Sequence, residues 1–406
     1  MPVLQAPMAG SSPVDLAVAV AEAGGMGARG ALQDSPDRIA AWVGEFRARS
    51  SGPLQLNVWI PEPVCNEQED RKRRSDKART FLNRFGPPGE PVTTPRPAFE
   101  EQCEALLRAR PTVVSSIMGL FEPDYVRRLH AQGIAWFACA TTLDEALAAQ
   151  DAGADAIVAQ GMEAGGHRGT FHQDAAEHTD VGLLALLPWF ADHLRVPIVA
   201  AGGIADGRGV AAALALGASA VQVGTALLRC PETATAPEWA AALTGLAPDA
   251  TVTTRVYTGR LARTAPTPYV KAWNQPGAPS PAPFPEQLEL TAQWRRGTNQ
   301  VDPANHWAGQ SAALATDKPA GDVLARMWRD ASGLIDAPAA PAGSLTPRGP
   351  LSGVGDRATV WKLDWALTAP PDLPGEPHSG LQFRLLPPSV HVKCQDMLGI
   401  GVSGDL

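Results

Sequence analysis

Short apolar runs alternate with Ala-rich amphipathic segments from residue 2 to about residue 228, and this repeat limits the fold more than any other feature of the chain. The runs are residues 3–8, 25–30, 54–60, 112–118, 134–140, 156–160, 197–204 and 220–225. Strands that alternate with helices indicate parallel βα units, and eight such units can close a (βα)8 TIM barrel. We therefore predict an α/β TIM barrel over residues 1–229, with functional residues just after the carboxyl ends of its strands.

One insertion and one change of rhythm interrupt this repeat. Residues 61–97 separate the third run from the next helical segment and carry a charged stretch at 67–79. The basic cluster Arg71–Arg74 follows acidic residues, so we predict that it lies on a solvated helix face. After Cys230 the βα repeat stops, which predicts a smaller second region or cap over residues 230–309. Helical spacing returns in residues 310–336, and we expect this helix to complete the barrel.

The last part of the chain, residues 337–406, is rich in Pro, Gly and Ala and has weak periodicity. Such a composition is typical of a linker or a poorly ordered tail. Residues 358–367 and 380–386 are the two short runs in it that look like strands. We assign this tail no function.

Charge and composition exclude several classes of partner. Lys and Arg number 34 against 42 Asp and Glu, which gives a formal charge of −8 and argues against binding to nucleic acid. No apolar run reaches the roughly 18 to 20 residues of a membrane-spanning helix, and the first residues lack the basic flank of a signal peptide. We expect a cytoplasmic protein with neither nucleic-acid nor membrane partners. The five cysteines are far apart, so we expect reduced, mostly packed thiols and no metal site.

The most informative string is residues 160–171, which begins where the sixth strand is predicted to end. It contains four glycines around His167 and starts with Gln160. Glycines let the backbone turn sharply and approach a ligand closely. A histidine at the mouth of a barrel can act as a base near neutral pH. We therefore predict that His167 is catalytic.

Glycine loops also follow the seventh and eighth strands, at Gly202-Gly203 and at Gln222-Val223-Gly224-Thr225. In barrel enzymes these two loops, with helix N-termini beside them, commonly form a phosphate site from backbone N–H groups. The glycine-rich fingerprint of a Rossmann fold is absent after the first strand. The loops therefore predict a site for one phosphate.

Two further strand ends complete a ring of candidate residues. Pro7 and Met8 end the first strand among small residues over which a flat ring could lie, and Asn57 offers a donor and an acceptor. With the phosphate loops, these residues outline a site for an aromatic heterocycle that bears a phosphate. Flavin mononucleotide (FMN) fits that description.

These strings, with Thr258-Gly259-Arg260 and Trp307-Ala308-Gly309-Gln310, resemble the nitronate monooxygenase family, formerly called 2-nitropropane dioxygenases. The resemblance covers about residues 2–335. It implies an FMN enzyme, monomeric or homodimeric, that oxidises alkyl nitronates with O2 to carbonyl compounds and nitrite or nitrate. It further implies that His167 is the active-site histidine and that FMN binds to Asn57, Gln160, Gly165, Gly203, Gln222, Val223, Gly224 and Thr225.

The sequence departs from the family where Leu261-Ala262-Arg263-Thr264 replaces the usual Pro-Ala-Arg-Gly, and in the tail, which has no counterpart. Two other readings stay open. An FMN-dependent reductase that uses NAD(P)H, acting on enoyl-acyl carrier protein or on quinones, resembles the same barrel. An FMN-binding protein without turnover is the non-enzymatic alternative. Gln160 and the sequence His167-Arg168-Gly169 favour the nitronate enzyme.

Overall fold

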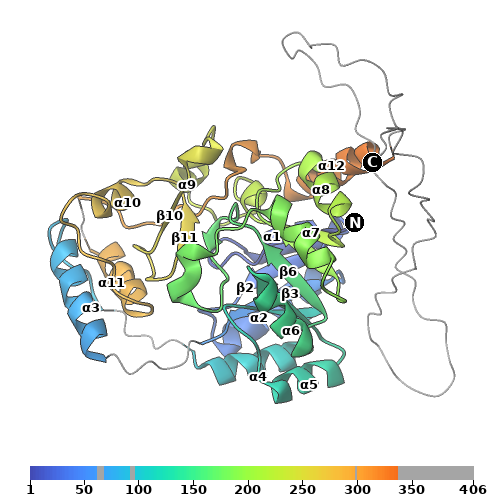
Figure 1. Cartoon of the computed structure of the whole chain (residues 1–406), viewed down its shortest axis with the longest axis horizontal. Helices are drawn as coiled ribbons and strands as arrows, with labels where there is room; N and C mark the ends of the chain where they lie inside the picture. The colour runs from blue at the N-terminus through green and yellow to red at the C-terminus, as the bar shows by residue number, and fades with distance from the viewer. Residues whose placement is uncertain (62–67, 92–96, 298–299, 337–406) are drawn as a thin grey trace, which may run out of the picture. The chain divides into compact units, whose positions relative to one another are not determined.

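The computed structural model describes residues 1–61, 68–91, 97–297 and 300–336, and eight parallel strands form its centre. The strands are β1 (Val3–Gln5), β2 (Gly27–Gly30), β3 (Leu54–Trp59), β4 (Val113–Ile117), β5 (Ala135–Ala140), β6 (Ala156–Gln160), β8 (Ile198–Ala201) and β9 (Ala220–Val223), joined in the order β1-β9-β8-β6-β5-β4-β3-β2 (Figure 1). A parallel bridge between Leu4 and Met26 joins β1 to the start of β2. The sheet therefore closes on itself, which confirms the predicted TIM barrel.

Alternate residues of each strand face two different cores, because side chains of a strand point to opposite faces in turn. Val113 and Phe137 pack inside the barrel, whereas their neighbours Val114 and Trp136 pack outside against the helices. Both faces are apolar, so the strands read as nearly continuous hydrophobic runs.

Among the described residues, eight helices pack into the core around the barrel: α1 (Val14–Glu22), α2 (Pro36–Arg49), α4 (Phe99–Ala109), α5 (Pro123–Ala131), α6 (Leu143–Asp151), α7 (Leu183–Ala191), α8 (Gly207–Ala215) and α12 (Ala320–Ile335). The last of them, α12, contacts both α8 and α1. Its Val323, Leu324 and Met327 are buried in the same core as the other helices. Among the described residues, no helix is both long enough and apolar enough to cross a membrane.

A second region is built on a three-stranded antiparallel sheet of β10 (Val252–Thr254), β11 (Ala262–Thr264) and β7 (Gly166–His167). This region also contains helices α9 (Pro237–Ala242), α10 (Pro268–Trp273), α11 (Glu286–Arg295) and α3 (Gln68–Leu82). Short 3-10 helices lie elsewhere along the described chain: η1 (Gln173–His178), η2 (Thr225–Leu227), η3 (Pro248–Ala250) and η4 (Ala312–Leu314). We call the residues around α3, α10 and α11 the cap. Phe81, Tyr257, Trp273 and Trp294 share its separate hydrophobic cluster.

Helix α3 comes from the insertion between β3 and β4, yet it packs against α11 (Figure 1). Arg71 donates from Nε and Nη2 to the carboxylate of Glu286 at 3.0 and 2.7 Å and from Nη2 to the carbonyl oxygen of Phe284 at 2.6 Å. Arg74 donates to the carbonyl oxygen of Pro281 at 2.9 Å. The prediction of a solvated basic face is therefore wrong for Arg71 and Arg74, because residues three apart share one helix face and this face meets the cap.

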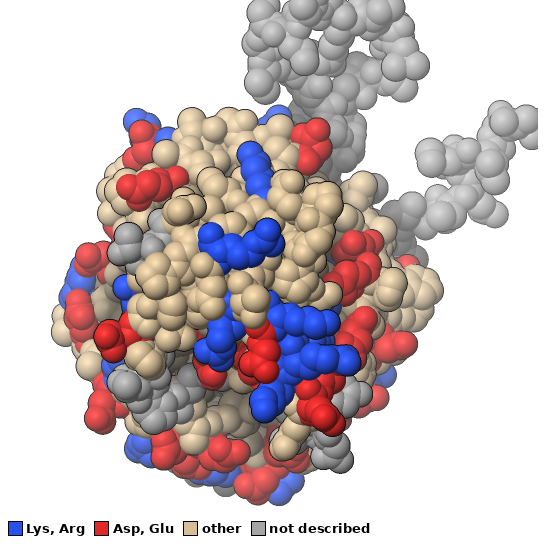
Figure 2. All heavy atoms as spheres, turned by 90° about the vertical axis from the view of Figure 1, so that its left-hand side faces the viewer, with Lys and Arg blue, Asp and Glu red and all other residues tan. Residues whose placement is uncertain are grey.

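The other two members of the basic cluster, Lys72 and Arg73, are exposed as predicted. Figure 2 looks onto this side of the molecule and shows Lys and Arg side chains gathered among Asp and Glu. Two predictions lie outside the described residues: the structure of the tail at 337–406 and the packing of Cys65 and Cys394. Cys103, Cys139 and Cys230 are free and buried.

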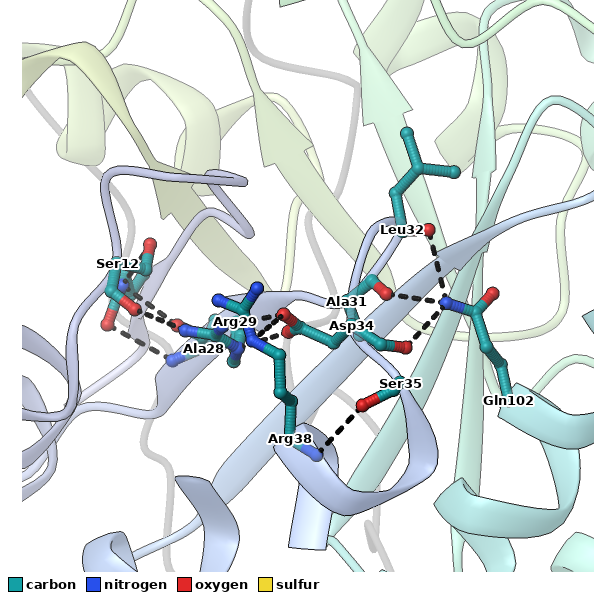
Figure 3. Close-up of polar contacts among 10 residues, drawn as sticks. Ser12, Ala28, Arg29, Ala31, Leu32, Asp34, Ser35, Arg38 and Gln102 are labelled. Atoms are coloured by element: carbon teal, nitrogen blue, oxygen red, sulfur yellow. Dashed lines mark hydrogen bonds and ion pairs between the residues drawn. The ribbon is translucent and has the colours of Figure 1, made fainter. Parts of the chain in front are cut away.

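One buried amide holds the loop between β2 and α2 at the rim of the barrel (Figure 3). The Nε2 of Gln102, from α4, donates to the carbonyl oxygens of Ala31, Leu32 and Asp34 at 2.8, 3.1 and 3.0 Å. The Asp34 carboxylate in turn accepts two hydrogen bonds from Arg29 at 2.5 and 2.9 Å. A side chain from α4 therefore fixes the shape of a loop that α2 follows.

We expect Gln102→Leu to lower the free energy of unfolding by about 1–3 kcal/mol, because buried carbonyl groups would lose their donor while the side-chain volume is nearly kept. Urea unfolding curves measure this change. The matched control is Gln132→Leu at the exposed end of α5. Equal losses in both variants would contradict the role given to Gln102.

Candidate active site

A cavity of about 700 Å³ lies at the carboxyl ends of the barrel strands and extends under the cap. Its lining includes the segment that follows β1, residues of β3 and β6, both glycine loops, and residues of α11 and the 304–309 segment. Most of the predicted site residues line it: Pro7, Met8, Asn57, Gln160, Gly165, His167, Gly202, Gly203, Gln222, Gly224 and Thr225. The barrel therefore brings together residues that are separated by more than 200 positions in sequence.

Val223 is the exception among the predicted residues. It is 1% exposed and lies in the core between the barrel and the helices, while its neighbours Gln222 and Gly224 line the cavity. The alternation of side chains along β9 explains this difference, since consecutive residues cannot both face the interior. The Val223 side chain therefore lies outside the cavity that the other predicted residues line.

The backbone of His167 is fixed by a sheet that joins the barrel to the second region. His167 lies in β7 and pairs with Ala262 of β11. Its Nε2 is 2.9 Å from Thr258 Oγ1. The imidazole also contacts two indoles, with ring centroids 4.6 Å from Trp59 and 4.9 Å from Trp307. The ring therefore has one anchored nitrogen and aromatic neighbours that limit its rotation.

The surroundings of His167 favour its neutral form. Burial in the site lowers the pKa of His167 to about 3, and the positive charge of Arg260 lowers it as well. Arg260 is 2% exposed, and its guanidinium lies over the rings of Phe284 and Trp59 at 4.5 and 5.5 Å from their centroids. At neutral pH His167 is therefore an uncharged group that can accept a proton.

Gln160, at the end of β6, holds the loop that carries His167. Its Nε2 donates to the carbonyl oxygen of His167 at 2.9 Å, and its Oε1 accepts from the N–H of Gly169 at 2.8 Å. The Gln160 carbonyl oxygen accepts from Arg168 Nη1 at 2.8 Å. The residue therefore shapes the site through the backbone on both sides of the histidine.

A polar network crosses the floor of the cavity. Asn57 Nδ2 donates to the backbone and side-chain oxygens of Ser115 at 3.2 and 3.0 Å. Gln55 Nε2 donates to Ser115 Oγ at 2.8 Å and to Gln222 Oε1 at 3.3 Å. Within the described residues, the buried Oε1 of Gln55 has no hydrogen-bond partner. Because a buried polar atom without a partner is costly, this floor is suited to a ligand that supplies a donor.

The two glycine loops offer backbone donors. Gly202 and Gly203 have φ of +122° and +68°, a conformation that favours glycine. In the part of the chain that the structure describes, the N–H groups of Gly202, Gly203, Gly224 and Thr225 donate to no protein acceptor. Such a set of free N–H groups can bind a phosphate.

The expected contribution of a helix N-terminus beside these loops is not found at α8. Its N-cap residue, Asp206, accepts from the N–H groups of Arg208 and Gly209 at 3.0 and 3.3 Å. A carboxylate already occupies that helix end. The donors available to a phosphate are therefore those of the loops.

Sequence reasoning gave no role to four residues that surround His167: Trp59, Thr258, Arg260 and Trp307. Thr258, Arg260 and Trp307 lie in strings that resemble the family, which was the one available signal. Their contacts depend on the pairing of β7 with β11, and the sequence of two such short strands carries no clear period.

The chain is similar to several known proteins. A family model described as nitronate monooxygenase matches residues 1–330. The nitronate monooxygenase of Paraburkholderia phytofirmans is 37% identical over 339 residues, 81% of this chain and 92% of the relative. That of Pseudomonas aeruginosa is 37% identical over 343 residues, 82% of this chain and 96% of the relative.

Two solved structures share the fold. Nitroalkane oxidase from Streptomyces ansochromogenes matches with a TM-score of 0.74 and 33% identity, over 82% of this chain and 96% of its own. FabK from Thermotoga maritima matches with a TM-score of 0.62 and 25% identity, over 82% and 92% of the two chains. The family model and the curated relatives both cover the barrel and the cap, and the chain therefore belongs to the nitronate monooxygenase family of oxidoreductases.

Proposed function

We propose that the protein is an FMN-dependent nitronate monooxygenase that oxidises alkyl nitronates, and nitroalkanes after proton removal, with O2 to carbonyl compounds and nitrite or nitrate. The observation that carries this proposal is the neutral imidazole of His167, anchored by Thr258 at the wall of a cavity whose other end offers free backbone N–H groups. The names of the relatives, nitronate monooxygenase and nitroalkane oxidase, support the same chemistry.

The residues of the cavity fit FMN. The N–H groups of Gly202, Gly203, Gly224 and Thr225 would hold its phosphate, and the floor formed by Asn57, Gln55 and Gln222 would meet the polar edge of its ring. Pro7 and Met8 would support the ring from the β1 side. When bound, FMN would supply the redox chemistry with O2, and the protein would supply orientation and electrostatics.

His167 would act on the proton of a neutral nitroalkane. Its neutral imidazole can take the acidic proton from carbon and then remain beside the nitronate as a cation. A base with a depressed pKa is weak, but the negative charge that forms on the substrate favours the protonated ring. A nitronate supplied as such needs no base, so His167 would then only position it.

We expect the flavin released from the purified protein by acid to be FMN and not FAD, because the two loops form one phosphate site. Chromatography against both standards identifies it. Finding FAD, or no flavin after reconstitution, would contradict this prediction.

The function itself is tested by anaerobic reduction of the bound flavin. We expect an alkyl nitronate to bleach its absorbance and NADH to reduce it far more slowly. Oxygen consumption with nitrite detection then checks the products. Rapid reduction by NADH without reaction toward nitronates would favour the reductase alternative.

We expect His167→Asn to retain FMN and to lower kcat/KM for neutral nitroalkanes by about 10²- to 10⁴-fold, the usual value of a general base, with a smaller loss for preformed nitronates. His193→Asn, on an exposed histidine that follows α7, is the matched control. Equal losses with both substrates would show that His167 is not the base.

The dependence of kcat/KM on pH gives an independent check of the protonation state of His167. Since the pKa of His167 is about 3 in place of 6.5, lowering the pH from about 8 to about 5 should not protonate it. We therefore expect kcat/KM of the wild type for a neutral nitroalkane to stay constant over this range. A loss of activity with an apparent pKa near 6.5 that disappears in His167→Asn would contradict the effect assigned to burial.

A further inference from the structure

The two ends of the cavity differ in chemistry. The barrel end presents the free N–H groups of the glycine loops. The cap end is lined by Tyr257, Leu288, Ala292 and Trp307, and also by the polar residues Thr258, Thr291, Arg295 and Asn305. The Tyr257 hydroxyl is 2.6 Å from Thr267 Oγ1, so its polar atom is already engaged. Arg295 is likewise engaged, with the Pro303 carbonyl oxygen and with Asn305. The apolar surface that this end offers to a ligand is therefore that of Leu288, Ala292 and the aromatic rings.

Helix α11 contributes to this end through one face. Leu288, Thr291, Ala292 and Arg295 all line the cavity, and their spacing of three, four and seven residues places them on one side of the helix. Leu290 and Trp294 point into the hydrophobic cluster of the cap. We call the four lining residues the α11 face. The helix is thus divided between a packing side and a side toward the cavity.

The α11 face is fixed relative to His167 at both ends. Gln287 Nε2 donates to the carbonyl oxygen of Val256 at 2.6 Å, two residues before Thr258, which anchors the imidazole. At the other end Arg295 Nε donates to the carbonyl oxygen of Pro303 at 3.1 Å, in the segment that leads to Trp307. A substrate held at His167 therefore lies between the two segments to which α11 is tied.

We propose that the α11 face selects substrates by their organic group, and that the preferred substrates are nitronates with an apolar chain of several carbons. The charged end of the substrate lies at His167, and the chain runs along Leu288 and Ala292. This inference rests on the proposed function. Each buried methylene contributes about 0.8 kcal/mol, which corresponds to about fourfold in affinity.

The test uses the FMN-loaded protein and preformed n-alkyl nitronates from nitroethane to nitrohexane. For the wild type we expect kcat/KM to rise by up to about fourfold per methylene. Ala292→Phe fills the cap end, so the ratio of kcat/KM for hexyl and ethyl nitronates should fall by about tenfold or more while the ethyl value changes by less than about threefold. Leu288→Ala should enlarge the cap end, so that kcat/KM continues to rise with chains longer than those that the wild type accommodates.

Binding supplies a readout that does not depend on turnover. The n-alkyl carboxylates are planar anions that the enzyme cannot oxidise in this way, and their dissociation constants are measured from changes in flavin absorbance. In Ala292→Phe we expect the dissociation constants of these carboxylates to lose their dependence on chain length, as kcat/KM does for the nitronates. Glu289→Ala, at an exposed position of the same helix, is the control and should keep the wild-type profile. Flavin content reports whether each variant is folded.

The outcomes separate the two claims. If the wild type oxidises nitronates but the chain-length profiles of both Ala292→Phe and Leu288→Ala equal that of the wild type, the role of the α11 face is wrong and the proposed function stands. If the wild type oxidises no nitronate of any length, the proposed function fails and this inference fails with it. A profile that changes equally in Glu289→Ala would also overturn the inference, because the effect would then not come from the cavity side of α11.

Discussion

The pairing of β7 with β11 is the interaction on which the site depends. β7 is a two-residue strand, Gly166–His167, and belongs to the loop after barrel strand β6. β11 belongs to the second region. Their register places His167 opposite Ala262. This short ladder fixes His167 relative to the barrel and to the second region at once, so that its side chain lies where the two regions meet.

Two different reasons explain the glycines that precede the histidine: Gly166 has a φ of +76°, which favours glycine, and Gly165 is closely packed. A Cβ on Gly165 would lie 2.5 Å from the N atom of Gly309 and 2.9 Å from Thr225 Oγ1. Neither neighbour could move far, because Gly309 N donates to that same Oγ1 at 3.0 Å. The loop after β6, the loop after β9 and the 307–310 segment therefore meet without room for a side chain. The absence of side chains at Gly165 and Gly309 is what permits three chain segments from distant positions to enclose one site.

The sequence was sufficient to predict the barrel because the repeat of apolar runs and amphipathic segments is a local signal, read one unit at a time. It also led us to expect Gln160, His167 and the glycine loops at one rim, since strand ends in a barrel share a rim, and these residues line one cavity. It was not sufficient for Val223, where the choice between two faces of β9 depends on a register of one residue. Nor did it reveal Arg71, whose partners at Phe284 and Glu286 lie more than 200 positions away. Long-range pairs of this kind carry no period in the sequence.

Buried arginines near the loop of residues 160–169 give the site its electrostatic character. Arg168 donates to the carbonyl oxygens of Gln160 and Thr179, and Arg263 donates to that of Met162 at 2.9 Å. Burial lowers the pKa of both groups, which reflects the cost of removing a cation from water. A carbonyl oxygen satisfies a donor without cancelling its charge. The carboxylates of Asp180 and Glu163 act on both guanidinium groups and offset part of this cost. Burial and the positive charge of Arg260 oppose protonation of His167 in the free protein, and the charge of Arg260 favours an anionic molecule in the cavity. An anion that enters reverses the balance at the imidazole, because its negative charge favours the protonated ring. In the proposed mechanism, the same arrangement would keep His167 neutral before a substrate loses its proton and would stabilise the ion pair that follows.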